Sequence, residues 1–246
     1  MSAGPDFYDD ASVFAAYRAT RSASDDLNAH VEAPLVEALV ADVRGEDVVE
    51  LGCGDGGYGV DLLRCGARSY TGLEGSRLMC AAARQRLAAL DGWRLEERWL
   101  EEWQSEPASA DVVVSRMALH YVQDLPPVLK QAYRCLRPGG RLVLSVEHPV
   151  VTSHYATNLS GSIPDRWTVT DYFVSGARSS SWLGAEVAKY HRTIEEWTRS
   201  LGEAGFAVTA LREGDPRGTA GRGGREALAL RRLVPMYLVL AAEPLT

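Results

Sequence analysis

The chain has 246 residues, 46% of them hydrophobic, and a formal net charge of −7 at pH 7. This length fits one large domain with at most a modest insertion, so we expect a single domain over residues 1–246. The acidic balance disfavours proteins that bind nucleic acid through a broad basic face, and the longest apolar run, 234–242, is too short for a transmembrane helix.

The first part of the chain predicts helices alternating with strands. A helical segment over residues 1–43 comes first, and we expect it to act as a lid. The next predicted elements are, in chain order, a strand at 47–51, a helix to about 64, a strand at 69–73, a helix from Ser76, strands at 94–98 and 110–115, a helix at 126–136 and a strand at 141–146. This alternation predicts an α/β fold with a doubly wound, mostly parallel seven-stranded sheet of the Rossmann-like kind.

The pattern changes after His148. Residues 150–190 are rich in Ser, Thr, Tyr and Trp, and we expect an insertion that covers the ligand end of the sheet, with a short hairpin at 167–173. The predicted remainder is a helix at 193–204, a strand at 206–211, a Gly/Arg-rich loop at 214–224 and a last strand at 235–242. We expect the last strand to close the sheet in antiparallel orientation.

The stretch VVELGCGDGGYG, residues 48–59, joins a buried strand to a glycine-rich turn. Glycines permit a sharp turn and let a ligand lie against bare backbone. Glu50 precedes this turn and Glu74 ends the next strand, so two carboxylates meet at one edge of the sheet. A pyrophosphate would sit poorly beside Glu50, whereas an ammonium group is attracted to it. The pattern favours S-adenosylmethionine (SAM) over a dinucleotide; the alternative is a packing turn without a ligand.

Four motifs resemble those of the class I SAM-dependent methyltransferases: VVELGCGDGG, TGLEGS, ADVVVSRMALHYVQD and LRPGGRLVLSVEHP. The resemblance runs end to end, and SVEHPVVTS and WLGAEVAKYHRT look like a bacterial small-molecule branch that includes indole carbon-3 methyltransferases. The cofactor-binding residues that this resemblance implies are Tyr17, Arg21, Glu50, Gly52, Gly54, Glu74, Gly75, Ser76, Leu100 and Ser115. The chain departs from many relatives at Trp99, where they carry an Asp for the adenine amino group; stacking could replace that hydrogen bond, or the aspartate position lies a residue or two away.

Candidate catalytic residues lie where the acceptor is expected. Histidine is the side chain whose usual pKa lies nearest neutrality, and His120 and His148 follow strand ends while His191 follows the insertion. The candidates are therefore His120, His148 and His191, with Tyr190 beside the last; a structural hydrogen bond is the alternative for each histidine. We expect Glu101 and Glu102 to be solvent-exposed charges rather than a catalytic pair. No metal-ligand spacing such as HExxH occurs, so we expect no metal.

These observations predict a methyltransferase of secondary metabolism that uses SAM and releases S-adenosylhomocysteine (SAH). Its expected acceptor is a small, aromatic or heteroaromatic (indole-like) molecule, and we expect no nucleic acid or membrane partner. Four scattered cysteines and the lack of a secretory signal predict a cytoplasmic protein, as a monomer or homodimer. The alternatives are an RNA or protein methyltransferase, a SAM-binding regulator without catalysis, and a nicotinamide oxidoreductase.

Overall fold

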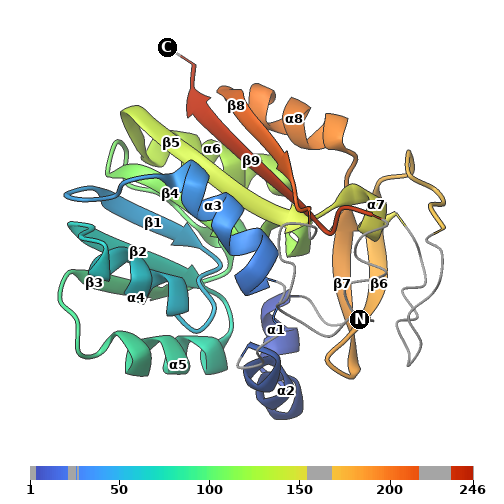
Figure 1. Ribbon diagram of the computed structural model, residues 1–246, viewed down its shortest axis with the longest axis horizontal. Coiled ribbons are helices and arrows are strands. Elements are labelled where there is room, and N and C mark those ends of the chain that lie inside the picture. Colours follow the sequence, from blue (N-terminus) through green and yellow to red (C-terminus); the bar gives the residue numbers. More distant parts are fainter. Residues whose placement is uncertain (1–3, 22–25, 27, 154–167, 216–233, 246) are drawn as a thin grey trace.

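The computed structural model describes residues 4–21, 26, 28–153, 168–215 and 234–245 (Figure 1). Its main feature is a seven-stranded sheet in the order β3-β2-β1-β4-β5-β9-β8. The strands are β1 (Asp47–Leu51), β2 (Ser69–Glu74), β3 (Trp93–Glu97), β4 (Ala110–Arg116), β5 (Leu136–Glu147), β8 (Phe206–Glu213) and β9 (Tyr237–Pro244). The first five run parallel, and β9 lies antiparallel between β5 and β8. The predicted doubly wound α/β fold with an antiparallel closing strand is confirmed.

Helices cover both faces of the sheet (Figure 1). They are α1 (Gly4–Tyr8), α2 (Ala11–Arg21), α3 (Ala33–Val40), α4 (Gly57–Arg64), α5 (Arg77–Leu87), α6 (Leu125–Cys135), α7 (Pro149–Thr152) and α8 (Ile194–Glu203). On one face α3, α4 and α5 bury residues such as Val36 and Leu87, and on the other α6 and α8 bury Leu129 and Trp197. Because apolar side chains fill both faces, the polar strand ends are the part of the sheet left for a site.

The N-terminal segment is divided more finely than its sequence predicts. Helices α1 and α2 are followed by a π-helical turn at Asn28–Glu32 that leads directly into α3, where Pro34 stands in the first turn. Val13 of α2 and Phe7 of α1 pack against Val187 in a small apolar cluster apart from the two main ones. This cluster joins the N-terminal helices to a hairpin from the second half of the chain.

That hairpin corrects one prediction. It consists of β6 (Gly176–Trp182) and β7 (Ala185–His191), whereas residues 168–173, within the predicted hairpin, form no strand. Besides Val187, the buried positions of the hairpin carry Arg178, Lys189 and His191, which are polar. A strand is predicted from apolar residues at alternate positions. Because most of the buried positions of β6 and β7 are polar, the sequence did not show this pattern there. Residues 216–224 of the predicted Gly/Arg-rich loop, and 154–167 of the insertion, lie outside the described residues.

Within the described residues, no helix combines the length and the apolar character that crossing a bilayer requires.

The strand that was expected to begin at 141 begins at Leu136, and Gly139 adopts a φ of 80° there. A register shift between Ala110 and Val112 of β4 accommodates the added residues. The RPGG sequence therefore forms an irregular entry into β5 rather than a separate turn.

Replacing Thr193 by alanine is expected to lower the free energy of unfolding by about 1 kcal/mol. Its hydroxyl accepts from Glu196 N at 3.1 Å, and the Glu196 carboxylate accepts from Thr193 N at 2.8 Å, so a capping box starts α8. The matched control is Thr198→Ala on the same helix, which removes no cap and should be neutral in urea unfolding. Equal losses in both variants would contradict a capping role.

Candidate active site

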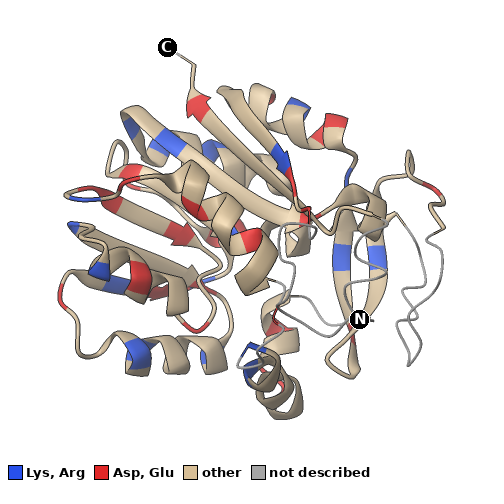
Figure 2. Cartoon of the chain, viewed as in Figure 1, with Lys and Arg blue, Asp and Glu red and all other residues tan. Residues whose placement is uncertain are grey.

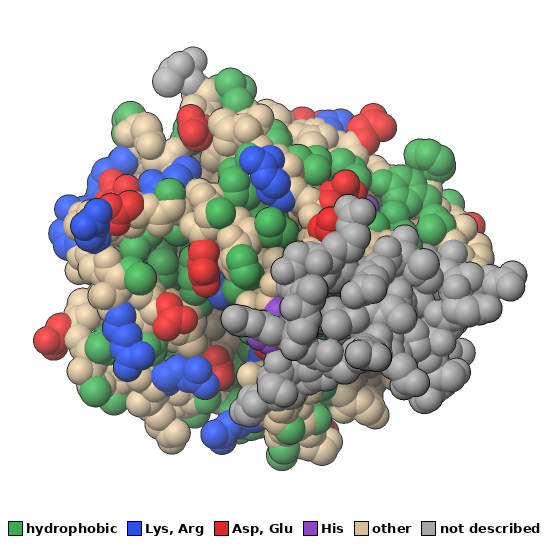
Figure 3. Space-filling view, viewed as in Figure 1, with side chains coloured by type: hydrophobic (Ala, Val, Ile, Leu, Met, Phe, Trp, Pro, Cys, Tyr) green, Lys and Arg blue, Asp and Glu red, His purple; other side chains and the backbone are tan. Residues whose placement is uncertain are grey.

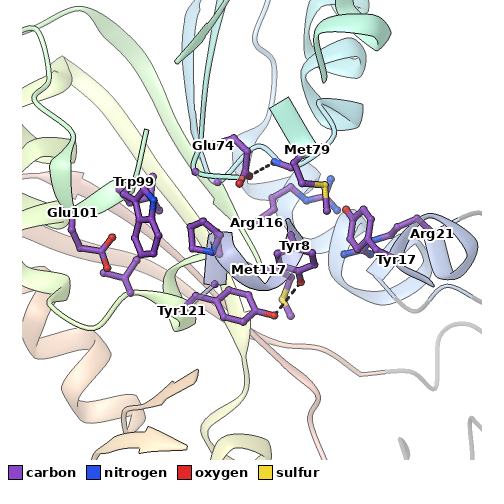
Figure 4. A pocket seen from close by; sticks show the side chains of 18 residues that line it. Tyr8, Tyr17, Arg21, Glu74, Met79, Trp99, Glu101, Arg116, Met117 and Tyr121 are labelled. Atoms are coloured by element: carbon purple, nitrogen blue, oxygen red, sulfur yellow. Dashed lines mark hydrogen bonds between the residues drawn. The ribbon is translucent and has the colours of Figure 1, made fainter. Parts of the chain in front are cut away.

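A pocket opens at the carboxyl ends of β1, β2 and β4, and the N-terminal helices lie against it (Figure 4). It is lined by Gly4, Pro5, Tyr8, Tyr17, Arg21, Gly52, Gly54, Glu74, Gly75, Met79, Trp99, Leu100, Glu101, Arg116, Met117, Ala118, Tyr121 and Val122. A second, more polar cavity of about 490 Å³ shares Tyr17, Gly52, Gly54 and Arg116 with it and reaches Glu50. The two adjoining cavities suit an elongated ligand with chemically different ends.

Glu74 links the end of β2 to the glycine loop. Its carboxylate accepts from Gly54 N and from Ser76 N, each at 2.8 Å, and its side chain is buried. Burial raises the pKa of Glu74, although these backbone N–H groups oppose the rise. A carboxylate has about four lone-pair positions, so the Glu74 carboxylate can still accept from hydroxyl groups of a ligand.

Glu50 occupies the other end of the site. It is 2% exposed and accepts a hydrogen bond from Tyr70 Oη at 2.7 Å. Burial raises the pKa of Glu50 to about 8, so its carboxyl group is largely neutral at pH 7 when no cation lies beside it. A buried carboxyl of this kind becomes ionised when a cationic group binds next to it.

Two glycines of the loop matter for different reasons: a side chain at Gly52 would clash with the protein, and one at Gly54 would enter the pocket. Gly52 has a φ of 74°, and a Cβ there would lie 2.3 Å from Ala118 Cβ. At Gly54, with a φ of 55°, a Cβ would meet only Tyr17 Oη, at 3.6 Å. The first glycine therefore permits packing of the loop on the residues after β4, and the second leaves bare backbone facing the pocket.

The sequence did not single out several residues that line the pocket. Tyr8 and Tyr121 point toward each other across it, and their hydroxyls lie 3.2 Å apart (Figure 4). Arg116 at the end of β4 pairs with the fully buried Glu32 and lies over the Tyr58 ring, 4.6 Å from its centroid. These contacts join residues far apart in the chain, so no local sequence signal could have revealed them.

Met117 lines the pocket and also has a strained backbone conformation, which is typical of functional positions. Its φ is 52°, a conformation that costs free energy for a residue with a side chain. Its backbone N donates to Ser145 O at 2.9 Å, so β5 holds the strained residue in place. Met117 directly follows β4, and residues that follow the strands of such a sheet are near its ligand site. This position in the sequence could have identified Met117.

Most of the predicted cofactor residues come together. Those that line the first pocket are Tyr17, Arg21, Gly52, Gly54, Glu74, Gly75 and Leu100, and Glu50 lines the second cavity. Two side chains instead bond to the protein itself: Ser115 Oγ donates to Leu51 O at 2.9 Å, and Ser76 caps α5 and donates to Asp9. Trp99 and Leu100 line the pocket, and Glu101, interpreted above as a solvated charge, lines it as well.

The three histidines differ in their surroundings. His148 Nδ1 accepts from Val150 N at 3.1 Å, and its Nε2 lies 2.9 Å from Glu213. His191 Nδ1 lies 2.7 Å from Thr152 Oγ1, and its Nε2 lies 2.9 Å from the Tyr172 carbonyl oxygen. Both nitrogens of each ring are therefore engaged by the protein. Tyr190 Oη donates to Gln123 at 3.0 Å.

His120 is the exception. It is 2% exposed, and neither ring nitrogen has a hydrogen-bond partner in the described part of the chain; Nδ1 is fully buried. Burial lowers the pKa of His120 to about 4, so the ring is neutral at pH 7. Its neighbour Tyr121 lines the pocket, with ring centroids 4.3 Å apart. Buried polar atoms are paired in folded proteins with few exceptions, so this ring is a candidate for contact with a ligand.

Among the described residues, no three His, Cys, Asp or Glu side chains are grouped so that they could hold a metal ion.

Comparisons with known proteins agree with this geometry. A family model described as a methyltransferase domain matches residues 48–140. The chain is 31% identical in sequence to a SAM-dependent methyltransferase of Mesorhizobium loti, whose crystal structure is known. The two structures superpose over 91% of this chain and 99% of that one, with a TM-score of 0.75. The crystal structure of a protein from Listeria monocytogenes, described as a SAM-dependent methyltransferase, superposes with a TM-score of 0.79 at 28% identity. The superposition covers 89% of this chain and 99% of that one. The trans-aconitate 2-methyltransferase of Azoarcus is 28% identical over 74% of this chain and 71% of its own.

Proposed function

Because this chain belongs to the SAM-dependent methyltransferases, we propose that it methylates a small, aromatic or heteroaromatic acceptor of the indole-like kind without a metal. The observation that carries the proposal is the aromatic end of the pocket, beside the residues assigned to the cofactor. Tyr8 and Tyr121 line it, and α1 and α2, which pack on β7, lie beside it, so the chain's own elements enclose the strand ends. A pocket with aromatic walls suits a flat, small molecule better than a polymer.

The two carboxylates define the proposed orientation of the cofactor. Glu50 would receive the ammonium group of SAM, and Glu74 the ribose hydroxyls. Gly52 and Gly54 would lend backbone to the methionine part, and Leu100 to the adenine edge. Tyr17 and Arg21 would close over the cofactor, while Gly75 lines the same pocket. Ser76 and Ser115 would act indirectly: Ser76 N holds the Glu74 carboxylate, and Ser115 Oγ holds the Leu51 carbonyl.

SAM supplies an activated methyl group, which a nucleophile can attack directly, so the protein's main tasks are to orient the acceptor and exclude water. We assign the base to His120. The acceptor's electron pair would form the bond to the methyl carbon while the bond from that carbon to the sulfonium sulfur breaks and its electrons stay on sulfur, and the proton that the acceptor then loses would pass to His120, whose Nδ1 has no partner in the described part of the chain. A base with a low pKa suits a proton that becomes acidic as the methyl group attaches, as in an aromatic ring that becomes cationic.

A methylation assay tests the proposed acceptor class. Purified protein with radiolabelled SAM should methylate members of a panel of small aromatic compounds and should leave total RNA unlabelled. One relative, the tRNA U34 carboxymethyltransferase of Pseudomonas paraeruginosa, is 33% identical over 42% of this chain and 33% of its own, so RNA belongs in the test. Acidic and basic side chains are interspersed on the described part of the face in Figure 3, which supports a small acceptor. Labelled RNA alone would contradict the proposal, as would SAM binding without turnover on any acceptor.

The affinity for SAM is expected to rise with pH between pH 6 and pH 7.5, by up to about tenfold per pH unit. The cause is the pKa of Glu50, about 8 in the free protein. Below that pH the neutral carboxyl must release its proton before it can pair with the ammonium group, so binding strengthens as the pH rises. Calorimetry in two buffers of different ionisation enthalpy should detect about one proton released at pH 6.5. A Glu50→Gln variant that kept the same pH slope would contradict this assignment.

A further inference from the structure

A polar cluster lies behind Tyr121, where the end of β5, the residues after β4 and the hairpin meet. It comprises His120, Glu147 and Lys189, which we call the acceptor-end cluster. Lys189 Nζ donates to Glu147 Oε1 at 2.6 Å, and the Lys189 side chain is only 5% exposed. Arg178 of β6 and Lys189 of β7 stand opposite each other in the register of the hairpin, whose strands show blue bands in Figure 2. Lys189 is therefore a deeply placed cation whose partner comes from the main sheet.

The cluster has more hydrogen-bonding capacity than the protein uses. A carboxylate accepts at about four positions and an ammonium group has three donors; within the described chain, each uses one on the other. Both nitrogens of His120 are without a partner in the same part of the chain. Glu147 keeps 22% of its side chain exposed, so the unused positions can be reached. The buried Nδ1 of His120, which has no partner in the described part of the chain, indicates a ligand at this place, because native proteins pair their buried polar groups.

The cluster adjoins the cofactor pocket. Tyr121 lines that pocket, its ring contacts His120, and Lys189 Nζ lies 5.9 Å from the centroid of the same ring. Lys189 also lies 5.8 Å from the centroid of the Trp182 ring. A flat molecule held against these aromatic faces would reach the cluster at one end and the cofactor at the other.

The charges of the cluster favour a neutral ligand. Glu147 and Lys189 neutralise each other, and burial keeps His120 neutral, an effect to which Arg192 adds. Arg192 itself donates to the carbonyls of Val122 and Gln123, and the carboxylates of Glu196 and Asp124 act against its charge. A carboxylate or an ammonium group brought here would leave one charge without compensation in a buried place, which is expensive. A neutral group with both a donor and an acceptor would instead bond to Glu147 and Lys189 together.

We propose that the acceptor-end cluster binds the polar group of the acceptor and selects a neutral donor–acceptor group, such as a primary amide, over an ammonium or a carboxylate. This proposal rests on the function proposed above. Lys189 and Glu147 would be specificity-determining residues, whereas His120 takes the proton.

Three probes with the same ring test the selection. Indole-3-acetamide is neutral, indole-3-acetate is anionic and tryptamine is cationic at pH 7. Their binding to the SAH-loaded full chain is measured by calorimetry, without any need for turnover. The amide should bind at least tenfold more tightly than either charged probe. Binding of the amide without methylation in the presence of SAM would leave the selection intact and contradict the proposed function instead.

Two variants should reverse the selection in opposite directions. Lys189→Met frees Glu147, so tryptamine should become the preferred probe by at least tenfold over indole-3-acetate. Glu147→Gln frees Lys189, so indole-3-acetate should become the preferred probe by a similar factor. A purely structural ion pair would weaken all three probes alike. Unchanged SAH affinity shows that each variant is folded, and the double variant, which carries neither charge, should discriminate between the charged probes by less than threefold.

Several outcomes would overturn the proposal. They are equal effects of both variants on all probes, a wild-type preference for a charged probe, and no binding of any probe to the folded, SAH-loaded protein. A variant that lost SAH binding would be replaced by Lys189→Arg, which keeps the charge and should keep the wild-type preference; a loss of that preference would count against the proposal.

Discussion

Glu74→Ala is expected to weaken SAM binding by about a hundredfold or more. Hydrogen bonds to a charged group contribute about 1.5–3 kcal/mol each, and two ribose hydroxyls would bond to this carboxylate. Each 1.4 kcal/mol corresponds to about tenfold in affinity. The carboxylate also accepts from Gly54 N and Ser76 N, so its removal loosens the loop that the methionine part would contact. Calorimetric titration of SAM into the purified variant measures the loss.

The matched control is Glu97→Ala. Glu97 ends β3 and is the registered neighbour of Glu74 in the sheet, yet its side chain is 40% exposed and pairs with Arg84. It should leave SAM affinity unchanged within about twofold, because exposed ion pairs contribute little. Equal effects of the two substitutions, or unaltered affinity in Glu74→Ala, would remove the ribose assignment. A titration with NAD in place of SAM excludes the dinucleotide alternative if it produces no heat.

His120→Ala is expected to lower kcat by about a hundredfold to a thousandfold while the affinity for SAM stays unchanged, since a positioned base contributes about 10²–10⁴. The ring contacts the protein through packing alone in the described part of the chain, so its loss removes no hydrogen bond from the fold. The activity of the wild-type enzyme should show no histidine inflection between pH 6 and pH 8. Burial places the pKa of His120 near 4, and the neutral, proton-accepting form is fully present above about pH 5.

The control for this variant is His148→Asn. Asparagine is a good helix N-cap, so it can replace the ring nitrogen that accepts from Val150 N at the start of α7. Its kcat should stay within about threefold of wild type. A larger loss there than in His120→Ala would move the base to His148, and a small loss in both would mean that positioning alone suffices for methyl transfer.

Local sequence predicted the half of the site that we propose binds the cofactor. A strand that ends in an acidic residue and runs into glycines favours SAM over a dinucleotide, and Glu50, Gly52, Gly54 and Glu74 all come to the two adjoining cavities. Parallel strands end at one edge of the sheet, so the alternation of strands and helices is enough to place residues that are distant in sequence together. Thr193 as the start of α8 is a further local signal that the structure confirms.

The acceptor half could not be predicted in this way. His120, His148 and His191 look alike in sequence, and only the tertiary contacts of Val150, Glu213, Thr152 and Tyr172 show that two of the three rings are fully engaged. The hairpin was misplaced because three of its four buried positions are polar. The partner of its Lys189 is Glu147, 42 residues away in the chain. Sequence determines what depends on neighbours along the chain, such as turns, caps and strand ends. Which buried charge finds a partner depends on packing between distant segments, and only the folded chain decides that.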